Sequence, residues 1–126
     1  MHLDTHVVVW LRSGRFDLIP TPLHDRLETE ELAISAIVRL ELGYLEEVGR
    51  LTEDPEVTLA ELRRGFGVVV DPTDFGAVAQ RASQADLAFT RDPFDRLIAA
   101  QADLAGAALV TKDRLLRKRL SYAIWD

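Results

Sequence analysis

Residues 1–10 of the 126-residue chain read MHLDTHVVVW and place one acid, Asp4, between two apolar segments. A carboxylate seldom occupies such a position unless another group pairs with it or it takes part in chemistry. The valines at positions 7–9 favour a strand by propensity, and Asp4 would then lie inside that strand. Alternatively, a short strand ends at Asp4 and a helix follows over residues 5–12. That helix would be apolar on nearly every side and would need a partner on its outer face as well as its inner one.

Short apolar segments alternate with helical patterns along the rest of the chain. The segments expected to form strands are residues 1–3, 32–34, 67–70, 108–111 and 123–125. The helical patterns lie between them, at about residues 5–12, 36–49, 59–64, 74–85, 93–105 and 114–120. This alternation predicts an α/β sandwich with parallel strands and crossover helices, and the chain length predicts a single domain over residues 1–126. In such sheets the functional crevice lies outside the C-terminal ends of the strands.

The composition, with 48% hydrophobic and 29% charged residues, is that of an ordinary globular protein. No apolar run reaches the roughly 20 residues of a membrane span and no signal peptide is visible, so we expect no membrane association. The absence of cysteine excludes disulfides and thiolate metal sites and suits a reducing cytoplasm. The net charge of −6 argues against a generic nucleic-acid binder unless acids are gathered to hold cations. Positive charge is concentrated in one stretch, which holds Lys112, Arg114, Arg117, Lys118 and Arg119.

Glu41 is the first of three further acids in unexpected positions. The residues three and four positions away from it are apolar or aromatic, and helical geometry puts them on its own face: Ile37, Val38, Tyr44 and Leu45. Glu41 therefore points toward the core or into a cleft. Arg39 is the one nearby basic residue that could pair with it.

The segment that begins RDPFD contains two acids with different expected roles. Pro93 suits the first helical position, with Asp92 as the N-cap, and Asp95 falls in the first turn, where an acid suits the helix dipole. Asp95 is also in line with Ile98 and with two alanines on the face expected to be buried. The pattern therefore favours a capping role for Asp92 and an inward position for Asp95.

Asp113 ends the apolar run ALVTKD much as Asp4 ends HLD. Two parallel strands that end in aspartate place two carboxylates at the same edge of a sheet, although each could also cap the helix that follows. Carboxylates brought together without compensation repel one another, and hard divalent cations remove that repulsion. A site made only of acids suits Mg²⁺ or Mn²⁺ better than Zn²⁺. The three histidines, at positions 2, 6 and 24, show no ligand spacing.

Three segments together resemble the PIN domain, in particular the VapC-type ribonuclease toxins of bacterial toxin–antitoxin pairs. These segments are LDTHVVVW, ISAIVRLELGYL and RDPFDRLIAAQADLAGAALVTKD, and the resemblance covers essentially the whole chain. It implies a PIN-like three-layer α/β/α sandwich with a mainly parallel central sheet, and it favours a short first strand that ends at Asp4. The four acids of the family fall on Asp4, Glu41, Asp95 and Asp113. Small hydroxyl residues and one more acid match positions beside them: Thr5, Ser35, Thr111 and Asp92.

This resemblance implies that the chain would be a metal-dependent endoribonuclease that a VapB-like antitoxin neutralises. The acids would hold one or two Mg²⁺ or Mn²⁺ ions, with Asp4 and Asp113 as direct ligands and Glu41 and Asp95 completing the shell or positioning a water. The basic stretch that starts at Lys112 could then follow the RNA backbone. The apolar helix at residues 5–12 would meet the antitoxin or the partner in a homodimer, or a neighbouring helix of the same chain would cover it.

Two other interpretations compete with this one. In a phosphoacceptor receiver domain, Asp71 would be the phosphorylated residue, Asp4 a metal ligand and Lys112 the lysine at a strand end. The usual pair of adjacent acids after the first strand is absent, and Glu41 and Asp95 would have no role. The other competitor is a PIN fold that has lost catalysis and acts only in binding, against which stands the presence of all four acids.

Overall fold

The computed structural model describes residues 1–126 and contains one five-stranded sheet. Its strands are β1 (His2–Leu3), β2 (Ala33–Ile34), β3 (Val69–Val70), β4 (Leu109–Val110) and β5 (Ala123–Ile124). The strand order is β3-β2-β1-β4-β5, and every neighbouring pair is parallel. The predicted α/β class is thus confirmed, with a sheet that is wholly parallel.

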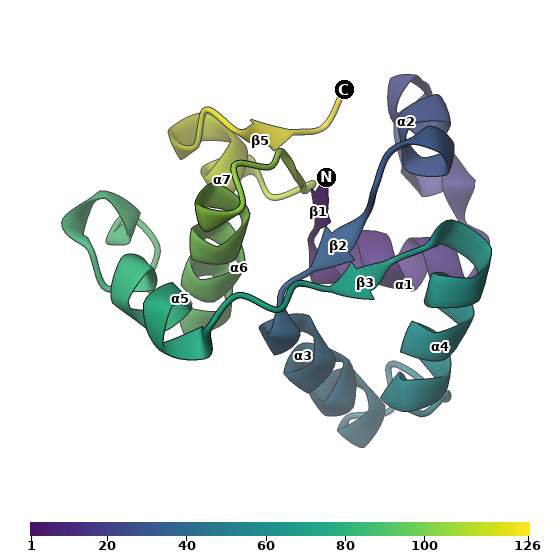
Figure 1. Cartoon of the computed structure of the whole chain (residues 1–126). Coiled ribbons are helices and arrows are strands. Elements are labelled where there is room, and N and C mark those ends of the chain that lie inside the picture. Colours follow the sequence, from purple (N-terminus) through teal and green to yellow (C-terminus); the bar gives the residue numbers. More distant parts are fainter.

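Seven α-helices connect and cover the strands: α1 (Thr5–Arg12), α2 (His24–Thr29), α3 (Ala36–Glu47), α4 (Pro55–Phe66), α5 (Phe75–Ala82), α6 (Pro93–Leu104) and α7 (Arg114–Arg119). Figure 1 shows α5 and α6 on one side of the strands and α1, α2 and α4 on the other, so the sheet has helices on both sides. Three short 3₁₀ turns complete the regular structure, at Phe16–Leu18, Thr21–Leu23 and Ala85–Leu87. No helix has both the length and the apolar character that crossing a bilayer requires.

The structure of the first twelve residues decides between the two interpretations of Asp4. The first strand ends at Leu3, and the helix α1 begins at Thr5 with Asp4 as its N-cap. Of the apolar residues expected to surround this helix, Val8 is fully buried, while Val9 and Trp10 are half-buried against the core. The chain itself therefore covers much of the apolar surface of α1.

Two helices, α4 and α2, differ most from the sequence-based expectation. The helix expected over residues 59–64 begins earlier, at Pro55, because Asp54 caps it through a bond from the Glu56 amide. Asp92 and Pro93 give α6 the same type of start. The helix α2 was not predicted, because its sequence, HDRLET, has only one buried apolar residue, Leu27.

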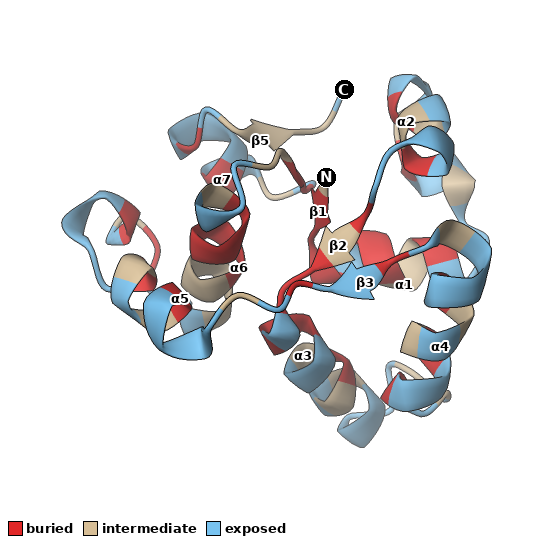
Figure 2. Cartoon of the chain, viewed as in Figure 1, coloured by how far each residue is buried: buried red, intermediate tan, exposed pale blue.

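The core is one cluster of 25 buried apolar residues between the sheet and the helices. Figure 2 shows buried residues along β1 and on the inward faces of α1 and α6, with exposed residues on the outward faces of α4 and α5. Strand β3 lies at the edge of the sheet, and its two valines, Val69 and Val70, are 44% and 45% exposed. Among the strands, the central ones, β2, β1 and β4, contribute residues to this core.

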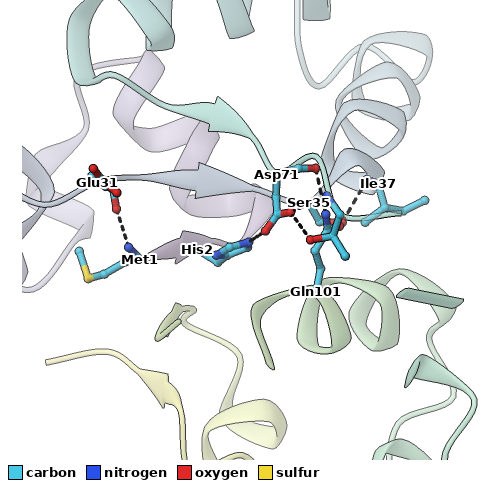
Figure 3. A network of polar contacts seen from close by, with 8 residues as sticks. Met1, His2, Glu31, Ser35, Ile37, Asp71 and Gln101 are labelled. Carbon is cyan, nitrogen blue, oxygen red and sulfur yellow. Dashed lines mark hydrogen bonds and ion pairs between the residues drawn. The ribbon is translucent and has the colours of Figure 1, made fainter. Parts of the chain in front are cut away.

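A buried polar network joins β1, the end of β3 and α6 (Figure 3). His2 Nε2 lies 2.8 Å from the Asp71 carboxylate, which also accepts bonds from the Thr73 amide and hydroxyl, and Gln101 Nε2 donates to the Asp71 carbonyl. Burial lowers the pKa of His2, and this outweighs the effect of Asp71. Burial also raises the pKa of Asp71, but its hydrogen bonds outweigh burial and lower it overall. We therefore describe the pair as a neutral imidazole bonded to a carboxylate.

Candidate active site

The parallel register brings the C-terminal ends of β1 and β4 side by side. His2 pairs with Leu109 and Leu3 with Val110, so Asp4 and Thr111 follow their strands at the same level. The Asp4 amide continues the ladder by donating to the Val110 carbonyl at 3.0 Å. The sheet edge proposed from the sequence is therefore where the candidate site lies.

Two threonine hydroxyls hold the acids at this edge. Thr111 Oγ1 donates to Asp4 Oδ2 at 2.6 Å and accepts a bond from the Asp113 amide at 3.1 Å. Thr5 Oγ1 donates to Glu41 Oε1 at 2.8 Å, while the Thr5 amide donates to Asp4 Oδ1 at 2.8 Å. One chain of hydrogen bonds thus runs from Glu41 through Thr5, Asp4 and Thr111 to the backbone of Asp113.

The capping function and the site function coincide in the same side chains. Asp113 caps α7 by accepting from the Leu116 amide, and Asp92 caps α6 by accepting from the Phe94 amide. Asp4 caps α1 in the same way. A cap uses one carboxylate oxygen in Asp92 and Asp113, so the other oxygen stays free to face the site.

Five carboxylates line a pocket of about 610 Å³: Asp4, Glu41, Asp92, Asp95 and Asp113. None of them forms a salt bridge, and Arg39, the base nearest to Glu41 in sequence, pairs with Glu56 instead. The structure thus brings together all four acids predicted from the sequence, and Asp92 with them. Such a group of unpaired acids is costly without a counter-charge.

The electrostatic cost appears most clearly at Asp95. Its half-buried carboxyl has a pKa raised to about 7, first by burial and then by repulsion from Asp92, Asp4, Asp113 and Glu41. Burial also raises the pKa of Glu41, together with the charges of Asp4 and Asp92, against the lowering effect of the Thr5 hydroxyl. Asp95 is therefore a carboxyl that can hold a proton near neutral pH.

Four further residues complete the wall of the pocket: His6, Trp10, Lys112 and Arg114. His6 and Trp10 were not predicted as site residues, although their spacing of four puts them on one face of α1, directly after the Asp4 cap. Lys112 and Arg114 belong to the predicted basic stretch.

The other members of the basic stretch lie farther along α7 and do not line the pocket. These residues, Arg117, Lys118 and Arg119, are exposed at the C-terminal end of the helix, and Arg119 lies over the Phe89 ring.

Two other predicted positions have different surroundings. Ser35 is buried at the end of β2 and caps α3 by accepting from the Ile37 amide, without contact to an acid. Tyr44, expected to share the face of Glu41, is 47% exposed and packs on Phe94, with 5.7 Å between ring centroids.

Asp71 lies outside the pocket. Its carboxylate is buried and already bonded to His2 and Thr73. A phosphoacceptor aspartate has to be accessible, so this geometry disfavours the receiver interpretation.

The donor set of the pocket fits a hard divalent cation, because it consists of carboxylate oxygens that lack positive partners. No three of these side chains lie in positions from which they could hold one metal ion together. Mg²⁺ is usually bound through one or two carboxylates and keeps several waters, so this spacing suits a partly hydrated ion.

Comparison with known families agrees with this geometry. The family model described as "PIN domain" matches residues 1–119. The chain belongs to the PIN domain family. This PIN domain is 36% identical over 120 residues to "Ribonuclease VapC22" of Mycobacterium tuberculosis (strain ATCC 25618 / H37Rv), a match that covers 91% of this chain and 88% of that protein.

The PIN fold is also found in a solved structure with low sequence identity. A chain of the crystal structure of VapBC2 from Rickettsia felis, bound to a DNA fragment from their promoter, superposes with a TM-score of 0.68 at 20% identity. The match covers 99% of this PIN domain and 98% of that chain. The likeness shows that both chains share the fold over their whole length.

Proposed function

We propose that this PIN domain is an endoribonuclease toxin that cleaves RNA phosphodiester bonds with the help of Mg²⁺ or Mn²⁺. The observation that carries the proposal is the pocket at the C-terminal edge of the sheet, in which five carboxylates gather without a basic partner. The 36% identity to a VapC ribonuclease over most of both chains supports the reaction class.

Each acid has a proposed role. Asp4 and Asp113, which follow the adjacent strands β1 and β4, would be the direct metal ligands, while Glu41 and Asp95 would complete the shell or position the attacking water. A bound divalent ion would lower the pKa of a water and stabilise the negative charge on the phosphoryl and leaving oxygens. Thr5 and Thr111 orient the Glu41 and Asp4 carboxylates through the hydrogen bonds described above.

Basic side chains beside the acids would bind the RNA backbone. Lys112 and Arg114 line the pocket and form no ion pair within the chain, so both are free to contact phosphates. Arg117, Lys118 and Arg119 continue this positive charge along α7. We propose the cytoplasm as the compartment in which the chain would meet its RNA substrate.

The test is a ribonuclease assay with the purified protein in Mg²⁺, in Mn²⁺ and in EDTA, alongside the Asp4→Asn and Asp113→Asn variants. We expect cleavage by the wild type only with metal and a loss of cleavage in both variants. Equal cleavage by the wild type and the variants, or cleavage that persists in EDTA, would contradict the assignment.

We also propose a VapB-like antitoxin as the partner, with this chain forming a homodimer or a toxin–antitoxin hetero-oligomer. The structural match to a chain from a VapBC2 crystal structure supports this partnership. Co-expression with a candidate VapB-like antitoxin should restore growth and allow co-purification of both chains. If the toxin chain alone did not slow growth, the toxin assignment would fail even if the nuclease activity held.

A further inference from the structure

Trp10 is unusual because it is the one apolar residue that lines the acidic pocket. It is half-buried on α1, with its ring centroid 5.9 Å from that of Trp125 and 6.0 Å from the imidazole of His6. An indole that served only to fill the core would not need to form part of the wall of a charged cavity. The position therefore requires a functional explanation in addition to packing.

Lys112 gives the second observation. Its ammonium lies over the Trp10 ring, with Nζ 5.6 Å from the ring centroid. Five carboxylates line the same pocket, yet Lys112 forms a salt bridge with none of them. The indole thus holds a cation beside the acids without neutralising them, since a cation over a ring face is attracted by the ring quadrupole.

The dimensions and chemistry of the pocket fit a nucleotide. Its volume of about 610 Å³ is within the range of small-molecule sites. Its lining combines five carboxylates with the aromatic and cationic side chains of Trp10, His6, Lys112 and Arg114. Bases of single-stranded nucleic acids stack on aromatic side chains, and cations contact their phosphates.

We propose that Trp10 forms a stacking subsite for one base of the RNA, next to the bond that is cleaved. Lys112 leaves the indole when RNA binds and moves to the adjacent phosphate, so the base takes its place on the ring. His6, exposed and four residues before Trp10 on α1, widens the aromatic surface. The subsite rests on the proposed nuclease function, because it requires RNA to enter this pocket.

The ligand pair that tests the subsite differs only in the base. Adenosine or uridine 3′,5′-bisphosphate carries a base between two phosphates, and ribose 3,5-bisphosphate carries the same phosphates without it. Neither contains a phosphodiester bond, so cleavage cannot disturb the measurement. Stacking on one aromatic side chain should make the nucleoside compound bind about 5- to 150-fold more tightly than the abasic one.

Variants of Trp10 and Lys112 test the roles of these two residues separately. In calorimetric titrations, Trp10→Leu should bring the affinity ratio of the two ligands close to one, while Trp10→Phe should keep most of it. Lys112→Met should weaken both ligands by a similar factor and keep the ratio. Phe75→Leu is the matched control, since Phe75 is an exposed aromatic residue, 51% exposed, outside the pocket, and it should leave both affinities unchanged.

Fluorescence gives an independent measurement, because the chain has only two tryptophans. In the Trp125→Phe variant the emission comes from Trp10 alone, and the nucleoside bisphosphate should quench it where the abasic compound does not. This result decides the question even if Trp10→Leu fails to fold.

Three outcomes would overturn the subsite: no binding of the nucleoside compound, a wild-type ratio near one, or a ratio that persists in Trp10→Leu. An RNA cleavage assay on the same preparations separates this proposal from the nuclease proposal. Cleavage without base-dependent binding would contradict the stacking subsite and leave the nuclease proposal standing. Base-dependent binding without cleavage would support the stacking subsite and contradict the nuclease proposal.

Discussion

At the residue scale, the acids of the pocket are held in place by ordinary backbone and hydroxyl contacts. Asp4, Asp92 and Asp113 each accept an amide of the helix that they cap, and Thr5 and Thr111 donate to Glu41 and Asp4. Caps of this kind contribute about 0.5–2 kcal/mol each to stability. These contacts oppose the mutual repulsion that would otherwise turn the carboxylates away from one another.

Asp95 makes the cost of this arrangement measurable in the metal-free protein. Its pKa is raised to about 7 in the folded chain, whereas the unfolded chain releases the same proton near pH 4. The folded state therefore holds more protons between these pH values, and the stability contributed by Asp95 falls as pH rises from about 4 to about 7.

We expect Asp95→Asn in EDTA to be more stable than the wild type at pH 7.5, by ~1–2 kcal/mol after allowance for solvent screening. At about pH 3 the two proteins should have similar stability, because Asp95 is then protonated in both the folded and the unfolded state. Urea unfolding at the two pH values measures this, with Asp25→Asn, an exposed acid outside the pocket, as the control. A less stable Asp95→Asn at pH 7.5 would contradict the burial and repulsion described here.

At the scale of elements, the His2–Asp71 network joins β1, the end of β3 and α6. Strand β3 is an edge strand of two residues, and both of its side chains are exposed. The hydrogen bonds of Asp71, which follows this strand, therefore supply the buried contacts that Val69 and Val70 do not make. Hydrogen bonds to a charged group contribute about 1.5–3 kcal/mol each to stability.

Asp71→Ala should therefore lower the free energy of unfolding by ~2–4 kcal/mol, because it removes the acceptor of His2 and Thr73. The RNA cleavage rate of the folded variant should stay within about twofold of the wild type, since Asp71 does not line the pocket. Denaturant unfolding and a cleavage assay at a temperature where the variant is folded measure the two effects. Unchanged stability together with an inactive enzyme would support a functional role for Asp71 instead.

Local signals predicted those elements that have strong caps or clear periodicity. Glu41 and Asp95 were placed on inward faces by their neighbours at helical spacing. The helix over residues 5–12 has its expected bounds, but the valines at positions 7–9 also favoured a strand, and the PIN resemblance decided between the two. The helix α2 was missed because six residues with one buried leucine give no periodic pattern. His6 and Trp10 were missed because their role depends on which wall of the pocket α1 forms, and that depends on tertiary packing.

At the scale of the whole molecule, charge is divided between an acidic pocket and a basic helix end. The chain has a net charge of −6, yet α7 has three consecutive cations in its last turn, and two more cations line the pocket. An RNA that enters the pocket beside Lys112 would reach these cations by continuing along α7. The sequence could predict this basic stretch but not which members line the pocket.

Replacement of Arg117 and Lys118 by glutamine should weaken RNA binding and reduce its salt dependence. The slope of the logarithm of the binding constant against the logarithm of the salt concentration should change by about one for each phosphate that the protein no longer neutralises. The matched control is Arg63→Gln with Arg64→Gln, an exposed basic pair in the last turn of α4 that lies outside the acidic pocket. Binding is measured over a range of salt concentrations with RNA that cannot be cleaved. Equal effects of the two double variants would indicate general electrostatic attraction and not a path along α7.

We propose that the carboxylates of this pocket act in metal-dependent RNA cleavage. Single-turnover cleavage rates of the wild type and of Asp4→Asn, measured across a range of Mg²⁺ concentrations, test this role of the carboxylates. We expect the wild-type rate to rise and saturate with Mg²⁺, and Asp4→Asn to remain at least about 100-fold slower at saturation. An Asp4→Asn rate that equals that of the wild type, or a wild-type rate independent of Mg²⁺, would show that the pocket does not act in this way.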